Sequence, residues 1–294
     1  MLPNRFIVVI LLLLAFRLPA GAQSILEDEV DTEDYKHFYG KEILKNQQPI
    51  HYAYVRENDV IWETSIWRTV DMRIKFNQFF YYPINPEGVH GRKNFTYMVW
   101  EAIKNDKIQI FKDDECKIPI DNAFFVNKMT KGDTLELEII DEDENYDYKT
   151  VIVPHEFSTE NILQIYLKEA WYIDKVTTRQ WVRYLSLAVV ENKYRTIGEE
   201  RINIGMVPLF WIPMLSPAVQ QMLQQSEAYY EDNIAHLPSW MYILEDRHYE
   251  SFVTRESNRF NRTIMSYLTG VDALLESEKV ENKLMEISQD MWEF

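Results

Sequence analysis

The hydrophobic pattern from residue 60 to residue 83 predicts a helix followed by a strand. Apolar residues recur every fourth position in its first half, and one apolar stripe at this spacing is typical of a half-buried helix. The stripe comprises Ile66, Val70 and Ile74. Thr64 or Ser65 can accept a hydrogen bond from the first free amides, so we expect the helix to begin there. The aromatic run Phe79–Tyr82 then favours a strand, which Pro83 ends.

Further helices are predicted where apolar residues return at intervals of three and four. They are expected at residues 95–103, 160–168 and 219–230, with a weaker helix or a loop at 121–131. Asn94 and Ser158 are the expected caps of the first two. The C-terminus predicts two amphipathic helices, the second capped by Ser277. Their stripes comprise Phe260, Ile264, Leu268, Val271 and Leu275, and then Val280, Leu284, Ile287 and Met291.

Strands are predicted where apolar residues alternate with polar ones or form short bounded runs. They are expected at residues 107–111, 134–140, 148–153, 181–190 and 206–212. The last two are the expected arms of one hairpin, joined across a loop that contains Gly198 and Gly205. This mixture of helices and short antiparallel strands predicts an α+β fold with a helical C-terminus.

Two parts of the chain share a weak internal similarity. Trp67 and Asp71 precede the segment FFYYP, and Trp171 and Asp174 precede the segment LFWIP. The order agrees although the spacing differs, so a degenerate internal duplication is a hypothesis. The predicted bounds are 1–22 for a signal peptide, 23–50 for an acidic tether with an ambiguous short helix, 51–154 for an N-terminal α+β lobe and 155–294 for a C-terminal α+β lobe.

The N-terminus has the pattern of a cleaved signal peptide. Arg5 supplies a positive charge, Phe6–Phe16 is an apolar run, and Ala20 to Ala22 form a small-residue cleavage site. The apolar run is too short to span a bilayer comfortably, so a membrane anchor is the less favoured alternative. We therefore expect cleavage between Ala22 and Gln23 and export of a mature chain that is not lipidated.

Charge and cysteine content narrow the class of protein. The chain carries 47 acidic and 31 basic side chains, a net charge of −16, and the predicted signal peptide removes two arginines and no acid. An acidic chain lacks the basic face that nucleic-acid binding needs. The single cysteine, Cys116, cannot form an internal disulfide. Eight tryptophans are more than a modest core requires, so some are expected in subunit contacts.

Motifs for catalysis or cofactor binding are missing from the sequence. There is no G-x-S-x-G elbow, P-loop or G-x-G-x-x-G, and the six histidines are scattered. The segment DEDENYD from Asp141 resembles a calcium loop superficially, but Tyr146 stands in place of the turn glycine and Ile152 in place of the bidentate glutamate. We expect an acidic hairpin tip there, and no catalytic residue, cofactor or metal site. One alternative is a periplasmic protein that binds or cleaves carbohydrate, since tryptophans and spare carboxylates suit both roles.

Three parts of the chain together resemble one protein family. They are IWETSIWRTVDMRIKFNQFFYYP from Ile61, the group Lys168-Glu169-x-Trp171 with Asp174, and the C-terminus with ESN from Glu256, YLTGVDALLESE from Tyr267 and DMWEF from Asp290. This combination is similar to the signature of the gliding motility protein family GldN, also called PorN. The resemblance extends from about residue 59 to the end of the chain.

The resemblance implies a non-enzymatic component of the type IX secretion system in the periplasm. GldN-like proteins assemble with the outer-membrane lipoprotein GldK/PorK into a large ring, and they contact the inner-membrane-anchored GldM/PorM. It further implies self-association in the ring, association with the outer membrane only through the lipoprotein, and a role in protein secretion and, in gliding species, motility.

The residues that carry the family signature are the candidate interaction or core residues. They are Trp62, Trp67, Arg68, Asp71, Asn77, Tyr81, Tyr82, Pro83, Trp171, Asp174 and Trp292. Large aromatic side chains serve both in cores and in interfaces. The sequence alone leaves open whether Trp62 and Trp67 point inward or towards a partner.

Overall fold

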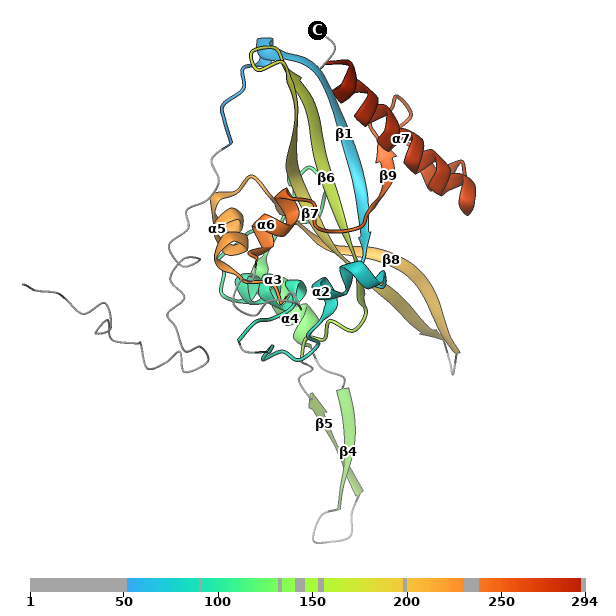
Figure 1. Ribbon diagram of the computed structural model, residues 1–294. Coiled ribbons are helices and arrows are strands. Elements are labelled where there is room, and N and C mark those ends of the chain that lie inside the picture. The colour runs from blue at the N-terminus through green and yellow to red at the C-terminus, as the bar shows by residue number, and fades with distance from the viewer. Residues whose placement is uncertain are drawn as a thin grey trace, which may run out of the picture. The chain divides into compact units, whose positions relative to one another are not determined.

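Figure 1 shows the chain as a computed structural model. It describes residues 52–89, 91–131, 134–140, 146–152, 156–197, 200–229 and 238–291. The predicted signal peptide, its cleavage point, the acidic tether, residues 141–145 of the acidic loop and Trp292 lie outside the described residues. None of the helices within these ranges is both long and apolar enough to cross a membrane.

Seven strands form one antiparallel sheet in the order β3-β2-β8-β7-β6-β1-β9. Their bounds are β1 Val60–Asp71, β2 Ile110–Phe111, β3 Pro119–Ile120, β6 Ile162–Asp174, β7 Arg179–Ile197, β8 Glu200–Pro213 and β9 Phe252–Glu256. The strands β4 Thr134–Ile140 and β5 Tyr146–Ile152 pair with each other in a separate hairpin. Strands from both predicted lobes share the large sheet, since β1 pairs with β6.

Six α-helices in the described part of the chain complete the fold and confirm the α+β prediction. They are α2 Gln78–Tyr81, α3 Phe95–Lys104, α4 Asn122–Thr130, α5 Pro217–Gln225, α6 Trp240–Glu245 and α7 Val271–Asp290. In Figure 1 the helices α2 to α6 lie together as one group, whereas α7 lies apart from them alongside β9.

The segment predicted as the first helix is strand β1, so that prediction was wrong. Its apolar residues are spaced by four, and four is a multiple of the strand period of two as well as close to one helical turn. Pairing with β6 along one edge and with β9 along the other decides between the two structures. The β-branched residues of the segment, Val60, Ile66 and Val70 among them, also suit a strand.

The aromatic run that was predicted as a strand is instead helix α2, preceded by a 3-10 turn at Lys75–Asn77. Phe79 and Phe80 are both buried, and their rings lie 6.1 and 5.4 Å from the ring of Trp240. A strand would send consecutive side chains to opposite faces, whereas a helical turn lets both rings reach the same core. Pro83 follows α2 directly after Tyr82, and the peptide bond between these two is cis.

The helix predicted at residues 160–168 is also wrong, because these residues begin strand β6. β6 lies between β1 and β7, and it is buried on both faces over most of its length. A strand buried on both faces has a nearly continuous apolar run, which periodicity does not distinguish from a buried helix. Ser158 caps a turn instead, where its Oγ accepts a hydrogen bond from the amide of Glu160.

Several predicted elements are confirmed. The Asn94 side chain accepts a hydrogen bond from the amide of Tyr97 and caps α3, and Asp121 caps α4 in the same way. β7 and β8 form the expected hairpin, but both strands continue into the predicted loop, and Gly205 lies within β8. β4 and β5 match the two strands expected around the acidic loop. α5 and β2 are shorter than predicted.

The C-terminus contains one long helix where two were predicted. Residues 260–268 form a loop and a 3-10 turn, Ile264–Ser266, and α7 begins after Gly270, whose φ of 61° most residues avoid. Ser277 lies inside α7 rather than at its start, and its Oγ accepts a hydrogen bond from the amide of Val253 at 2.7 Å. The Asn258 side chain accepts from the amides of Phe260 and Arg262, which holds the loop in a non-helical conformation.

The segments FFYYP and LFWIP also differ in structure. The first forms α2 and the second ends β8. Trp67 and Trp171, by contrast, lie on the neighbouring strands β1 and β6. The internal duplication stays a hypothesis.

Two apolar clusters stabilise the fold. The larger joins the sheet to α2, α3, α5 and α6, and its fully buried side chains include Trp240, Phe80, Phe95 and Phe210. The smaller joins β1 and β9 to α7. Its buried residues are Ile66, Val253, Ile264, Ala273, Val280 and Leu284. Along β1, Ile66 belongs to the small cluster and Val70 to the large one, so Arg68 lies between them on the same face of the strand.

Candidate functional site

A buried ionic group lies between the large and the small apolar cluster, around Arg68 of β1. Glu169 on β6 is completely buried, and Arg68 on β1 is 6 % exposed. The Arg68 Nε donates a hydrogen bond to Glu169 Oε2 at 3.1 Å, and Arg247 Nη2 lies 3.0 Å from the same oxygen. One carboxylate therefore pairs with two guanidinium groups, and this attraction repays part of the cost of removing the charges from water.

The same arginine links the sheet to α7. Arg68 Nη1 donates to Glu281 Oε1 on α7 at 2.5 Å. Trp171 lies against both arginines, with the guanidinium carbons of Arg68 and Arg247 at 5.9 and 5.0 Å from its ring. Its indole nitrogen donates to Glu169 Oε2 at 2.7 Å. Trp171 is thus held by charges of its own chain.

Two tyrosines extend the buried group towards α6. The hydroxyls of Tyr184 and Tyr249 lie 2.7 Å apart, and Tyr184 donates to the carbonyl of Leu244. Burial raises the pKa of Tyr249 to about 12, and burial together with Tyr249 raises that of Tyr184 well above its ordinary value. Burial lowers the pKa of Arg247, but the attraction of Glu169 outweighs this and leaves it raised. Both tyrosines are therefore neutral and Arg247 is charged at neutral pH.

A surface hollow of about 430 Å³ opens over this group. It is lined by Arg68, Ile74, Arg247, Tyr249, Glu250, Ser251, Phe252 and Glu281. Its arginines are paired with carboxylates, and no set of three or more His, Cys, Asp or Glu in the described ranges is placed to hold a metal ion. The arrangement is suited to fixing β1, β6 and α7 to one another.

On the opposite face of β1, Trp67 belongs to a second charged group. The guanidinium of Arg255 lies 3.5 Å from the centre of the indole ring, and the Lys168 ammonium lies 5.1 Å from it. The indole nitrogen donates to Asp114 at 2.9 Å, and the same carboxylate pairs with Arg255 and Lys168. Burial raises the pKa of Asp114, but the hydrogen bond from Trp67 and the two cations lower it by more, so the net shift of the pKa is downward. Trp67 is half-buried, and its indole ring contacts charged side chains of its own chain.

Asp71 and Asn77 fix the end of β1. The Asp71 carboxylate pairs with Arg73 and accepts a hydrogen bond from Gln164 on β6. Asn77 is completely buried, and its amide donates to the carbonyls of Asp71 and Glu250. Asn77 therefore joins β1 to the segment that precedes β9.

The other signature residues have local structural roles. Tyr81 is partly buried beside the large cluster, and Tyr82 is 48 % exposed. Asp174 accepts hydrogen bonds from the amide of Val176 and the hydroxyl of Thr177, which closes the turn between β6 and β7. Trp62 is half-buried against the small cluster.

The structure therefore brings Arg68 and Trp171 together and places Trp67 in a separate group. Both sets lie beside partners that the sequence patterns did not single out. These are Arg247, Glu281, Tyr184 and Tyr249 in the first group and Asp114 and Arg255 in the second. All of them come from distant parts of the chain and most lie outside the strands, so only the tertiary structure shows that they meet.

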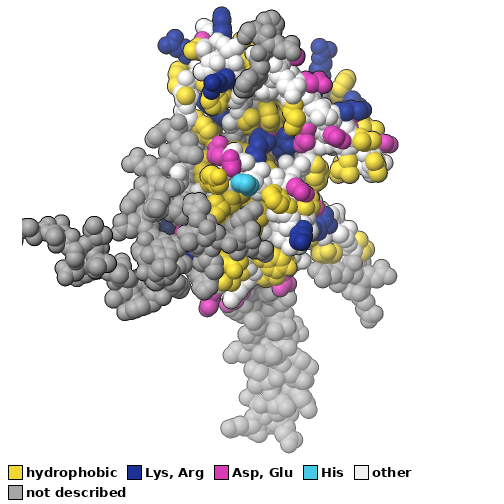
Figure 2. All heavy atoms as spheres, in the orientation of Figure 1, with side chains coloured by type: hydrophobic (Ala, Val, Ile, Leu, Met, Phe, Trp, Pro, Cys, Tyr) yellow, Lys and Arg dark blue, Asp and Glu magenta, His cyan; other side chains and the backbone are white. Residues whose placement is uncertain are grey.

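The outward side of α7 is the clearest exposed feature of this region. Exposed apolar residues recur on the helix side opposite to the buried stripe of the small cluster, and Figure 2 shows hydrophobic and charged side chains mixed over α7. We call this surface the α7 face. It consists of Val271, Leu274, Leu275 and Met285 with the polar residues Glu278 and Asn282. An exposed apolar stripe of this kind makes the α7 face a candidate interaction surface.

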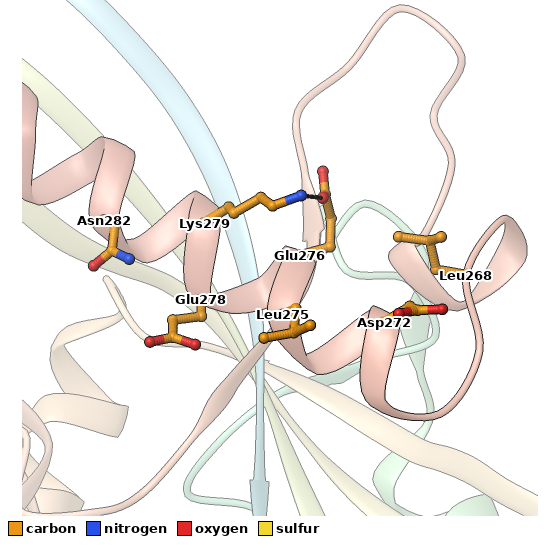
Figure 3. A pocket seen from close by; sticks show the side chains of 7 residues that line it. All are labelled: Leu268, Asp272, Leu275, Glu276, Glu278, Lys279 and Asn282. Atoms are coloured by element: carbon orange, nitrogen blue, oxygen red, sulfur yellow. Dashed lines mark hydrogen bonds and ion pairs between the residues drawn. The ribbon is translucent and has the colours of Figure 1, made fainter.

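Figure 3 shows a hollow of about 470 Å³ beside the α7 face. It is lined by Leu268, Asp272, Leu275, Glu276, Glu278, Lys279 and Asn282. Lys279 bends towards Glu276, with which it forms an ion pair of 3.1 Å, and Glu278 and Asp272 remain at the rim. The hollow is thus apolar at Leu268 and Leu275 and mainly acidic at its edge.

Comparison with known proteins identifies the family. No curated protein matches the chain. The family model of the gliding motility associated protein GldN matches residues 55–293, which includes the whole seven-stranded sheet and α7. The chain therefore belongs to the GldN family, and this membership associates it with gliding motility and type IX secretion.

Proposed function

We propose that the chain is a non-enzymatic structural subunit of the type IX secretion system in the periplasm. It assembles with an outer-membrane lipoprotein of the GldK/PorK kind into a large ring and contacts an inner-membrane-anchored protein of the GldM/PorM kind. It reaches the outer membrane only through the lipoprotein. The observation that carries the proposal is the match to the GldN family over residues 55–293.

Two features of the structure support a role in assembly. The buried charges are paired within the chain and join the strands to α7, as a rigid subunit requires. The exposed α7 face offers apolar surface for a neighbour. The alternative of a carbohydrate-binding protein has little support, because among the tryptophans that the structure describes only Trp181, at 43 %, is classed as exposed.

The proposal is tested by deletion and by purification from the envelope. Deleting the gene is expected to abolish secretion of cargo proteins that carry C-terminal signals, and a tagged full-length copy is expected to restore it. The tagged chain is expected to co-purify with the lipoprotein in a particle far larger than the 35.3 kDa chain. Normal secretion after deletion, together with a tagged chain that elutes as a free monomer, would contradict the proposal.

A further inference from the structure

The hairpin of β7 and β8 extends beyond the sheet. β7 pairs with β6 as far as Glu191, and residues 193–197 pair only across the hairpin with residues 200–205, from Lys193 with Gly205 to Ile197 with Glu200. We call residues 193–197 and 200–205 the arm. Figure 1 shows it reaching past the other strands of the sheet. Such a two-stranded ribbon has no layer of its own to cover its side chains, so it is suited to contact another chain.

The arm combines exposed apolar side chains with positive charge. Ile202 and Ile204 are 46 % and 57 % exposed, and Arg195, which pairs with Ile202 across the hairpin, is also exposed. Cross-strand partners share a face, so a cation and an isoleucine lie side by side. The arm contains three basic residues and one acidic residue in a chain whose net charge is −16.

The α7 face has the complementary character. Its apolar residues Val271, Leu274 and Leu275 are exposed, and Leu275 lines the same hollow as Asp272 and Glu278. The helix α7 as a whole carries six acidic and two basic residues. The arm and the α7 face are distant in the sheet order, since β7, β6 and β1 separate β8 from β9. Each surface is thus left open within the described part of its own chain and matches the other in hydrophobicity and in charge.

We propose that the arm of one copy docks on the α7 face of the next copy. The occupant is a second copy rather than another protein because the chain itself supplies the basic, apolar ribbon that an acidic, apolar face requires. Joining two α7 faces would oppose like charges, so the contact is head-to-tail. A head-to-tail contact leaves one arm and one face free at the ends, and it closes into a ring or continues as a filament. This inference rests on the proposed role as a ring subunit and names the surfaces that join neighbours.

Mixing two variants of the mature chain tests the contact. The arm variant is Ile202→Asp with Ile204→Asp, and the face variant is Leu274→Asp with Leu275→Asp, each measured alone and mixed by sedimentation over a range of concentrations. Wild type is expected to form larger species as concentration rises, and each variant alone is expected to stay monomeric. Their equimolar mixture is expected to stop at a one-to-one dimer, because only one arm and one face stay intact. Val176→Asp, at a site 74 % exposed in the β6–β7 turn, is the matched control and should associate like wild type.

Reversal of charge gives an independent readout. Arg195→Glu, or Asp272→Lys with Glu278→Lys, is expected to weaken association about tenfold at low salt. Mixing these two variants is expected to restore it, since each reversed arm then meets a reversed face. A wild type that is monomeric at every concentration, variants that associate like wild type, or mixtures that restore nothing would each overturn the proposal. Circular dichroism and thermal unfolding of every variant exclude loss of the fold as the cause.

Secretion by cells that carry the same variants separates this inference from the proposed function. Loss of secretion in the arm and face variants, with Val176→Asp normal, is expected. If deletion of the gene abolishes secretion while the arm and face variants secrete normally, the head-to-tail contact is wrong and the role in secretion stands. If deletion itself leaves secretion intact, the role in secretion is wrong.

Discussion

The two apolar clusters of this protein differ in how strongly they determine the structure around them. The large cluster packs five strands of the sheet against α2, α3, α5 and α6, and aromatic rings meet at its centre around Trp240. The small cluster holds α7 with six buried residues, and α7 is further tied by one hydrogen bond through Ser277 and by two ion pairs, Glu281 with Arg68 and Lys283 with Glu256. Many mutually supporting aromatic contacts make a region hard to displace, whereas a helix held by a small cluster depends more on each single contact.

The difference has a functional meaning. The helix that packs on the small cluster also has apolar residues on its outward side. A helix that is apolar on two sides buries one side within its own chain, and the other side stays exposed and available to a neighbour. Substitutions should therefore separate into those that unfold the subunit, those that loosen α7 and those that leave the fold intact.

Trp240→Ala is expected to have the largest effect. The side chain is completely buried and contacts the rings of Phe79, Phe80 and Phe95. Its removal should lower the free energy of unfolding by about 3–5 kcal/mol, measured by urea denaturation. Trp181→Ala, at a site 43 % exposed, is the control and should cost far less. Equal losses for the two variants would show that the large cluster is not the main source of stability.

Glu169→Gln tests the ionic group between the clusters. Without the carboxylate, Arg68 and Arg247 lose their common partner in a buried site. The expected loss of unfolding free energy is about 3 kcal/mol, because a buried charge is left uncompensated. Glu276→Gln, which removes the half-buried partner of the exposed Lys279 on α7, serves as the control and should leave stability nearly unchanged. If Glu169→Gln were as stable as wild type, the buried ionic group would not contribute to stability.

Leu284→Ala and Met285→Ala compare the two sides of α7 at adjacent positions. Leu284 is 1 % exposed in the small cluster, and Met285 is 61 % exposed on the α7 face. We expect Leu284→Ala to cost about 2 kcal/mol and Met285→Ala less than about 0.5 kcal/mol in thermal or urea unfolding. Were the order reversed, the orientation of α7 described above would be wrong.

The buried tyrosines predict a fall in stability at high pH. Burial raises the pKa of Tyr249 from 10.0 to about 12, so the folded chain keeps a proton that the unfolded chain releases above pH 10. Stability is fully present below pH 10 and declines as pH rises towards 12, by at most about 1.4 kcal/mol per pH unit for one such tyrosine. Urea unfolding between pH 8 and about pH 11 measures this slope. Tyr249→Phe should flatten it, and an unchanged slope would assign the effect to other groups.

Local signals in the sequence correctly predicted the elements whose structure depends on nearby residues. Asn94 and Asp121 cap helices through their own side chains, and β7 and β8 are neighbours in both sequence and space. The family signature also came from the sequence, and the family model confirms it. These features need no knowledge of distant contacts.

The elements that were predicted wrongly are those that distant partners decide. A spacing of four along β1 suits both a helix and a strand, and pairing with β6 and β9 selects the strand. The aromatic run of α2 has strand propensity, but the core around Trp240 accepts both phenylalanine rings only from a helical turn. In both segments, contacts between residues far apart in the sequence outweighed the local secondary-structure propensity.

For the candidate interaction residues, too, the sequence and the tertiary structure supply different information. The sequence by itself determined the family, the α+β class and the acidic character, and it selected Trp67, Arg68 and Trp171 as candidate core or interaction residues. Only the tertiary structure decided that these side chains are engaged by charges of their own chain, and that the arm and the α7 face are left open. The physical reason is that burial and charge pairing depend on which segments meet across the sheet, and one-dimensional periodicity does not contain that information.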